Sequence, residues 1–280
     1  MPIITFWSNG KEQTGKTLSM SAISTYMAIE HNVKILVIST TSKEETLSNC
    51  FFKRNKNKIN RDVFVRNQGI TAIDIGMSGL VKMARSNKVT PEMIKNYTTA
   101  VFKDSLEILF SGTKNSNADV EQYYPEIIKA SGQFYDYVFV DLDSTISPVT
   151  QKEILKISNV IVANINQKVS SVDDFIEEKK LNDALEPRKL LTLIGRYDKF
   201  SRYSAKNIAR YMKDRKMPIT IPYNTLFYDS AEDAQVPDMF LNYARTKTID
   251  KDDKNYIFLQ EVKRAEEAIL YKIQEVQMNY

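Results

Sequence analysis

Short runs of aliphatic residues alternate along this chain with longer stretches of helical pattern. The clearest runs are Lys34–Thr40 (KILVIST), Tyr137–Leu142 (YVFVDL), Asn159–Asn164 (NVIVAN) and Lys189–Ile194 (KLLTLI). Strands that are apolar at almost every position are buried on both faces, and such strands are typical of parallel sheets covered by helices. We therefore predict an α/β fold with a doubly wound, mostly parallel sheet flanked by helices, built as a single domain over residues 1–280.

The remaining predicted elements continue this alternation. The other predicted strands are Ile3–Ser8, a weaker run at Asp62–Arg66, a strand edge at Leu106–Phe110, and Pro218–Pro222. The predicted helices are Thr17–Glu30, Met77–Arg85, Pro91–Val101 and a C-terminal helix at about 253–278. Thr90 suits a helix N-cap because Pro91, which has no amide hydrogen to satisfy, would stand at the first helical position.

The composition excludes several classes of protein. Hydrophobic residues make up 42% and charged residues 26%, and the mean hydropathy is −0.37, which excludes a disordered tail, a collagen and a membrane-embedded bundle. No apolar run approaches the roughly 20 residues that a spanning helix needs, and the N-terminus lacks a signal-peptide pattern, so we expect a cytoplasmic protein. The single cysteine (Cys50) and single histidine (His31) exclude an internal disulfide and argue against a Ser-His-Asp hydrolase; both are predicted to be structural.

The strongest chemical signal is the segment GKEQTGKT at residues 10–17, between the first predicted strand and the first predicted helix. It matches G-x-x-x-x-G-K-[ST], a loop whose backbone amides cradle nucleotide phosphates. Gly15 permits the tight turn, Lys16 reaches the β- and γ-phosphates, and the Thr17 hydroxyl completes the shell of a Mg²⁺ ion. The residues predicted to bind the nucleotide here are Gly10, Lys11, Glu12, Gln13, Thr14, Gly15, Lys16, Thr17 and Leu18.

A phosphate loop of this kind needs a carboxylate on a neighbouring strand. The run Tyr137–Asp141 has four apolar or aromatic residues before a terminal aspartate, and the carboxyl end of such a strand lies beside the loop. We therefore predict Asp141 as the carboxylate on the metal side, together with Thr17. Asp143, two residues further on, is able to share or replace that role.

Lys11 narrows the class of protein. The loop resembles that of the deviant-Walker ATPases of the ParA/MinD family, which reads K-G-G-x-G-K-[ST], with Glu12 and Gln13 in place of the glycine pair. The resemblance implies ATP and Mg²⁺ as ligands. It also implies a sandwich homodimer in which Lys11 of each subunit reaches the nucleotide of the other. Lys11, Lys16 and Asp141 are then the predicted catalytic residues.

Two late segments extend the resemblance. LIGRYDKFS resembles the family's N-R-Y-D segment, with Gly195 where asparagine is usual, and IPYNTLFYDSAEDAQVPDMF resembles its I-P-Y segment. In the family these segments flank the adenine, which implies Arg196, Pro222, Tyr223 and Asn224 as neighbours of the base. Among subfamilies, the late segments look most like the TadZ/CpaE proteins, which position pilus-assembly machinery and would be recruited to a cell pole or the inner membrane face.

One departure concerns hydrolysis. After the second strand the family usually carries an acidic D-x-D switch, whereas this chain has Ser39, Thr40 and Thr41. Hydroxyl groups are poor bases near neutral pH, so we expect slow hydrolysis. Glu44 and Glu45 follow closely and are candidates to substitute for the missing carboxylates.

Three functions remain open from the sequence. The first is a spatial-organiser ATPase for a pilus or secretion machine. The second is a DNA-partition ATPase that binds DNA nonspecifically through the stripe Arg202, Lys206, Arg210 and Lys213, which is spaced for one face of a helix. The third is a metabolic P-loop enzyme, for which the sequence shows no acceptor motif.

The charged surfaces also have a plainer interpretation. The stripe and a second basic run at residues 53–58 fit solvated surface as well as they fit a binding site, because the net charge is only +4. The C-terminal helix carries an apolar stripe, and its polar face mixes acidic with basic residues. An interfacial membrane helix is richer in Lys and Arg, so we expect this helix to pack on the domain or a partner rather than on a membrane.

Overall fold

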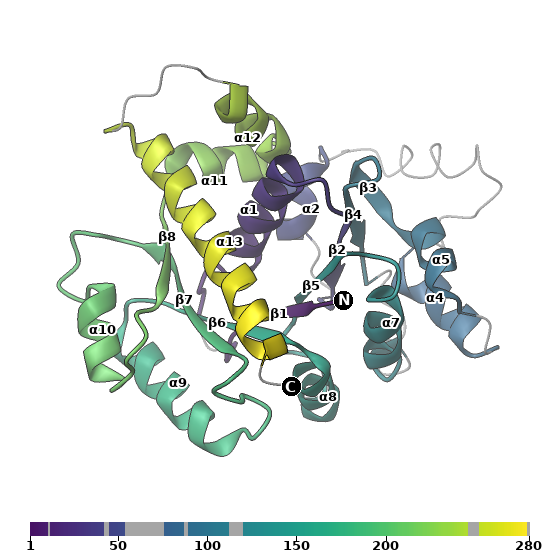
Figure 1. The fold of residues 1–280 in the computed structure, drawn as a ribbon, viewed down its shortest axis with the longest axis horizontal. Coiled ribbons are helices and arrows are strands. Elements are labelled where there is room, and N and C mark those ends of the chain that lie inside the picture. Colours follow the sequence, from purple (N-terminus) through teal and green to yellow (C-terminus); the bar gives the residue numbers. More distant parts are fainter. Residues whose placement is uncertain are drawn as a thin grey trace.

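The computed structural model describes residues 1–10, 12–41, 45–53, 76–86, 89–111, 120–245 and 252–278, and these ranges hold one eight-stranded sheet (Figure 1). The strands are β1 (Ile3–Trp7), β2 (Ile35–Ser39), β3 (Thr99–Phe102), β4 (Leu106–Leu109), β5 (Tyr137–Asp141), β6 (Val160–Ile165), β7 (Leu190–Tyr197) and β8 (Ile219–Pro222). Their order is β3-β4-β2-β5-β1-β6-β7-β8, with β3 antiparallel to β4 and the other neighbouring pairs parallel. The predicted doubly wound, mostly parallel sheet is confirmed.

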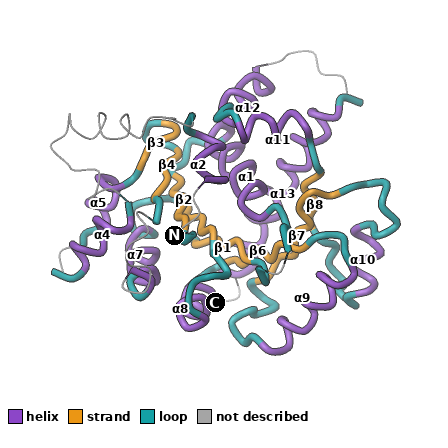
Figure 2. The backbone as a smooth tube through the Cα atoms, turned by 180° about the vertical axis from the view of Figure 1, so that it is seen from behind, coloured by secondary structure: helices purple, strands orange, loops and turns teal. Residues whose placement is uncertain are grey.

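Helices cover both faces of this sheet (Figure 2). One face is covered by α1 (Lys16–Glu30), α2 (Glu45–Phe51), α11 (Thr225–Glu232), α12 (Val236–Arg245) and α13 (Lys254–Met278). The other face is covered by α4 (Met77–Ala84), α5 (Pro91–Ile94), α7 (Tyr124–Ser131), α8 (Pro148–Ile157), α9 (Val169–Leu181) and α10 (Ala205–Tyr211). A 3₁₀ turn, η2, spans Lys95–Tyr97.

The strand sequences explain the two cores. Successive side chains of a strand point to opposite faces, so an uninterrupted apolar strand contributes to both cores. Phe6 of β1 stacks on Phe139 of β5 in the core under α1, with 5.9 Å between ring centroids. The next residue, Trp7, lies 6.4 Å from the ring of Phe175 in the opposite core.

The C-terminal helix α13 packs along the sheet rather than standing apart from it. Phe258, Val262, Ala265 and Ile269 of its apolar stripe are buried, and Phe258 stacks on Phe227 of α11 with 4.8 Å between centroids. The helix occupies Lys254–Met278 of the segment predicted at about 253–278, and its buried stripe packs on the domain. None of the helices in the described ranges has the length and apolar character needed to span a membrane.

One predicted helix is wrong in its second half. The segment predicted as Pro91–Val101 is helical only to Ile94, passes through η2, and then forms the edge strand β3. Thr99 and Val101 of β3 are β-branched, a type that favours strands, and antiparallel pairing with β4 gives the backbone groups of the strand partners. The predicted strand Asp62–Arg66 lies outside the described residues.

Candidate functional site

The loop between β1 and α1 lies at the carboxyl end of the sheet and turns on two glycines. Gly10 has φ of 76° and Gly15 has φ of 72°, a left-handed conformation that glycine adopts without strain. Gly15 is also the residue before α1, so the amides of the first helical turn face the loop. Lys11, predicted to be the second cation of the loop, lies outside the described residues.

A buried ion pair links this loop to the neighbouring strand. Lys16 Nζ lies 2.8 Å from Asp141 Oδ1 and donates to the Leu142 carbonyl, while Thr17 Oγ1 donates to Asp141 Oδ2 at 2.8 Å. The Asp141 side chain is only 2% exposed, so this carboxylate depends on its two partners in α1. The structure thus brings Asp141 against the loop, as the sequence predicted.

The same corner has oxygen ligands suited to a hard cation. Mg²⁺ prefers hydroxyl, carboxylate, phosphate and water oxygens, and Thr17 and Asp141 offer the first two. Ser39 is the cross-strand neighbour of Asp141, and among the described residues its buried hydroxyl has no hydrogen-bond partner. No group of three or more His, Cys, Asp or Glu side chains in these ranges is arranged to hold a metal. The residues present therefore fit Mg²⁺ only when phosphate and water complete its shell.

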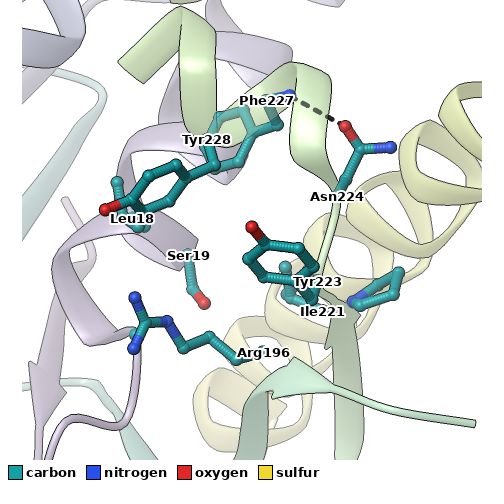
Figure 3. A pocket seen from close by; sticks show the side chains of 10 residues that line it. Leu18, Ser19, Arg196, Ile221, Tyr223, Asn224, Phe227 and Tyr228 are labelled. Carbon is teal, nitrogen blue, oxygen red and sulfur yellow. Dashed lines mark hydrogen bonds between the residues drawn. The ribbon is translucent and has the colours of Figure 1, made fainter. Parts of the chain in front are cut away.

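Beside the loop lies a pocket that is open to solvent (Figure 3). It joins α1 to the ends of β7 and β8 and to α11, and it is lined by Gly15, Leu18, Ser19, Arg196, Ile221, Pro222, Tyr223, Asn224, Phe227 and Tyr228. Segments far apart in the sequence, predicted separately to flank a base, thus meet next to the phosphate loop. The rings of Tyr223 and Tyr228 lie 6.2 Å apart on one side and offer aromatic surface to a planar ligand.

The polar atoms of Asn224 are already engaged. Its side-chain oxygen accepts from the Phe227 amide at 2.8 Å, which caps α11, and its Nδ2 donates to Asn255 Oδ1 at 2.8 Å. Figure 3 shows this amide directed at α11 and away from the pocket. Asn224 therefore shapes the wall of the pocket, whereas Arg196 is bound only weakly there: its Nη1 donates to Gln13 Oε1 at 3.2 Å.

Gly195 allows the close approach of β7 to the loop. A Cβ atom at this position would lie 2.2 Å from the Thr14 carbonyl oxygen, well inside any normal contact distance. The next residue, Arg196, has φ of 52°, a left-handed conformation that is uncommon for a side chain of this size. The position of the loop thus leaves no room for a side chain larger than that of glycine at residue 195.

Glu12 and Gln13, the residues in place of the glycine pair, connect the loop to flanking strands. Glu12 accepts a hydrogen bond from Asn166 Nδ2 and lies 3.3 Å from Lys168 Nζ, both just after β6. The Asn166 hydrogen bond is the main cause that lowers the pKa of Glu12; burial opposes it, and the hydrogen bond and charge of Lys168 lower the pKa further. The sequence analysis missed Asn166 and Lys168; their place just after a predicted strand was the available signal.

The segment that replaces the acidic switch contacts the end of β5. Thr40 Oγ1 donates to the Asp141 carbonyl at 3.0 Å and accepts from the Asp143 amide at 2.8 Å. Burial raises the pKa of the Asp143 carboxyl, but hydrogen bonds from Thr41 and Thr145 and the charge of Lys16 outweigh it, so the pKa is lowered. Glu44 and the side chain of Glu45 lie outside what the structure describes.

The predicted basic stripe is exposed, but it does not lie on one continuous helix. α10 spans only Ala205–Tyr211, so Arg202 precedes it and Lys213, with φ of 54°, follows it. Arg202 lies over the Tyr203 ring at 4.8 Å and Lys206 and Arg210 project from α10 itself. α10 ends before Met212 because the chain turns there, with Lys213 in a left-handed conformation. Of the basic run 53–58, only Lys53 is described.

The two residues predicted to be structural are both engaged in the fold. His31 Nε2 lies 3.0 Å from Glu266 Oε1 and so connects the end of α1 to α13. Cys50 is buried in α2, and burial raises the pKa of its thiol to about 12, which makes it unreactive at neutral pH.

No protein-family model and no curated protein matches this sequence, but solved structures match its fold. A ParA family ATPase from Chlorobium tepidum TLS superposes with a TM-score of 0.67 at 15% identity, covering 96% of this chain and 98% of that one. MinD from Pyrococcus horikoshii OT3, complexed with Mg-ADP, gives 0.64 at 15% identity over 97% and 98%. A proposed plasmid partition protein from Borrelia burgdorferi B31, bound to AMPPNP, gives 0.58 at 17% identity over 99% and 98%. This chain has the fold of the ParA and MinD ATPases.

Proposed function

We propose that this chain is a ParA/MinD-type ATPase that binds ATP with Mg²⁺ at the loop between β1 and α1. The observation that carries the proposal is the buried contact of Lys16 and Thr17 with Asp141, which joins a phosphate-binding motif to a carboxylate on the neighbouring strand. The nucleotides in the similar MinD and partition-protein structures, Mg-ADP and AMPPNP, support ATP as the ligand.

Each residue of the loop has a role that follows from its position. The amides around Thr14 and Gly15 and the N-terminus of α1 bind phosphate oxygens, and Lys16 exchanges part of its contact with Asp141 for the β- and γ-phosphates. Thr17 and Asp141 would hold the metal. Mg²⁺ supplies charge neutralisation of the phosphates.

The pocket beside the loop receives the base. Leu18, Pro222 and Tyr223 form an apolar and aromatic wall of the pocket. Arg196 is a polar group of the lining whose side chain is able to reorient, because it makes only a weak hydrogen bond to Gln13. Such a pocket holds a purine by stacking and burial, with few directional contacts. Asn224 contributes by fixing the start of α11.

The output of nucleotide binding is dimerisation. Lys11 of each subunit closes the site of the other, where a second cation offsets the charge of the triphosphate. With Ser39 and Thr41 in place of the acidic switch, hydrolysis is slow and the dimer persists. The biological role is to position a pilus or secretion assembly, in the cytoplasm or at a pole or inner membrane face to which a partner recruits it.

A second candidate function is DNA partition. The exposed cations Arg202, Lys206, Arg210 and Lys213 favour it, as does the likeness to the Borrelia partition protein. A gel-shift titration with ATP separates the two roles. Salt-sensitive, ATP-dependent binding to any duplex, lost when the four cations are replaced by alanine, supports partition; no binding at low salt supports the organiser role.

Isothermal titration calorimetry of ATP with Mg²⁺ tests the ligand. Wild-type protein should bind, and Lys16→Ala should lose binding almost completely while keeping its circular dichroism spectrum. Lys103→Ala, at an exposed turn between β3 and β4, is the matched control and should bind as wild type does. Equal affinity in the wild type and Lys16→Ala would show that the loop is not the nucleotide site.

A further inference from the structure

Three hydroxyl residues, Ser39 at the end of β2 and the following Thr40 and Thr41, lie beside the acidic segment that ends β5. Ser39 is the cross-strand neighbour of Asp141, Thr40 bonds the Asp141 carbonyl and the Asp143 amide, and the Thr41 side chain bonds the Asp143 carboxylate. A carboxylate at position 41 would meet the Asp143 carboxylate at hydrogen-bonding distance, where two like charges repel. A threonine at position 41 is therefore compatible with an aspartate at position 143, whereas a carboxylate at position 41 would repel it.

Asp143 is held in a defined place and remains open to solvent. Its Oδ1 accepts from the Thr145 amide at 2.9 Å, Thr41 holds the carboxylate from the β2 side, and its own amide is bound to Thr40. The side chain is half-buried, and Lys16 acts on it electrostatically. A carboxylate fixed by these two hydrogen bonds at the mouth of a phosphate loop still has acceptor sites free for a water molecule.

The other carboxylates described at this loop are already bound to other side chains. Asp141 is held by Lys16 and Thr17, and Glu12 is turned toward Asn166 and the β6 side of the loop. Asp143 lies on the opposite, β2 side, which is where the acidic switch residues are expected from the resemblance. Asp143, which follows the neighbouring strand β5, is thus a candidate for the acidic role expected from residues after β2.

We propose that Asp143, at the end of β5, orients the water that attacks the γ-phosphate in the slow hydrolysis that remains without a carboxylate after β2. This inference rests on the proposed ATPase function. The Asp143 carboxylate accepts a hydrogen bond from the water and directs its oxygen at the γ-phosphorus. A bond forms between that oxygen and phosphorus as the bond from phosphorus to the β–γ bridging oxygen breaks. The electron pair leaves with ADP, and both water protons end on the inorganic phosphate.

The inference predicts a defect in Asp143→Asn that is confined to the transition state. The ATP affinity should be unchanged, because Lys16, Thr17 and Asp141 are intact, whereas the single-turnover hydrolysis rate should fall about 10²-fold. Asp136→Asn is the matched control: Asp136 precedes β5 at the far end of the strand, where its carboxylate accepts from the Lys34 amide at 2.8 Å. It should hydrolyse ATP at the wild-type rate.

A second readout does not depend on turnover. ADP with aluminium fluoride mimics the planar phosphoryl group with an in-line water, whereas ADP with beryllium fluoride mimics the ground state. Wild type and Asp136→Asn should trap radiolabelled ADP with both fluorides, and Asp143→Asn should trap it with beryllium fluoride only. Equal trapping and equal hydrolysis in Asp143→Asn would overturn the role of Asp143. A wild-type protein that binds no ATP would instead overturn the proposed function.

Discussion

Gly195 offers the sharpest test of how β7 and the phosphate loop fit together. In Gly195→Ala the new methyl group would lie 2.2 Å from the Thr14 carbonyl oxygen and 3.3 Å from the Ser19 hydroxyl. The first atom belongs to the backbone of the loop, so no side-chain rotation relieves the contact. Either the loop or the end of β7 has to move.

The size of the movement follows from the contact distance. Non-bonded carbon contacts lie at about 3.5 Å, so the loop must shift by about 1 Å relative to β7. Overpacking of this kind costs about 1–3 kcal/mol, and a displacement of about 1 Å at a reacting site lowers rates about 10²-fold. Because Lys16 and Thr17 lie only two and three residues after Thr14, we expect ATP affinity in Gly195→Ala to fall about tenfold or more, which corresponds to about 1.4 kcal/mol.

Calorimetric titration with ATP and Mg²⁺, together with urea unfolding, measures both effects. Gly132→Ala is the matched control, because Gly132 ends α7 with φ of −63° and its added Cβ would meet nothing closer than 3.4 Å. That variant should bind ATP normally and be unchanged or more stable by about 0.4–1 kcal/mol. If Gly195→Ala matches wild type in both affinity and stability, the close approach of β7 to the loop is refuted.

Two further predictions concern the elements around the site. Burial raises the pKa of Glu266 from 4.5 despite the opposing charge of His31, so its contribution to stability is full below that value and is lost as the pH rises through the raised pKa. Urea unfolding over a pH series should show a smaller decline in Glu266→Gln, and an identical pH profile would contradict this. Asn224→Ala should lower the free energy of unfolding by about 1 kcal/mol, since it removes the cap on the Phe227 amide. A larger loss of ATP affinity than of stability in that variant would instead indicate that Asn224 contacts the base directly.

The parts of the fold that were predicted correctly are those that depend on the pattern of consecutive residues. The strand Tyr137–Asp141 is apolar up to its terminal aspartate, and the loop motif lies between a strand and a helix. The two patterns together predicted that Asp141 lies beside the loop, where it contacts Lys16. The edge strand β3 was missed because pairing with β4 outweighs the helical pattern of its residues.

Other features depend on contacts that no local pattern reports. Gly195 was recognised as a departure from the family, but its reason is the Thr14 carbonyl in a distant part of the chain. The contact of Thr41 with Asp143 likewise becomes visible only when β2 and β5 lie side by side. The engagement of Asn224 with α11 and α13 was also not predictable, since its neighbours suggest a binding residue.

The proposal that ATP is held between two copies of this chain is tested most directly by the mass in solution. Multi-angle light scattering after addition of ATP and Mg²⁺ should show a dimer that persists without any mutation that blocks hydrolysis. Lys11→Ala should bind ATP and remain a monomer, while Lys103→Ala should dimerise as wild type does. An ATP-loaded wild-type protein that stays monomeric would contradict the sandwich dimer and leave only the nucleotide site.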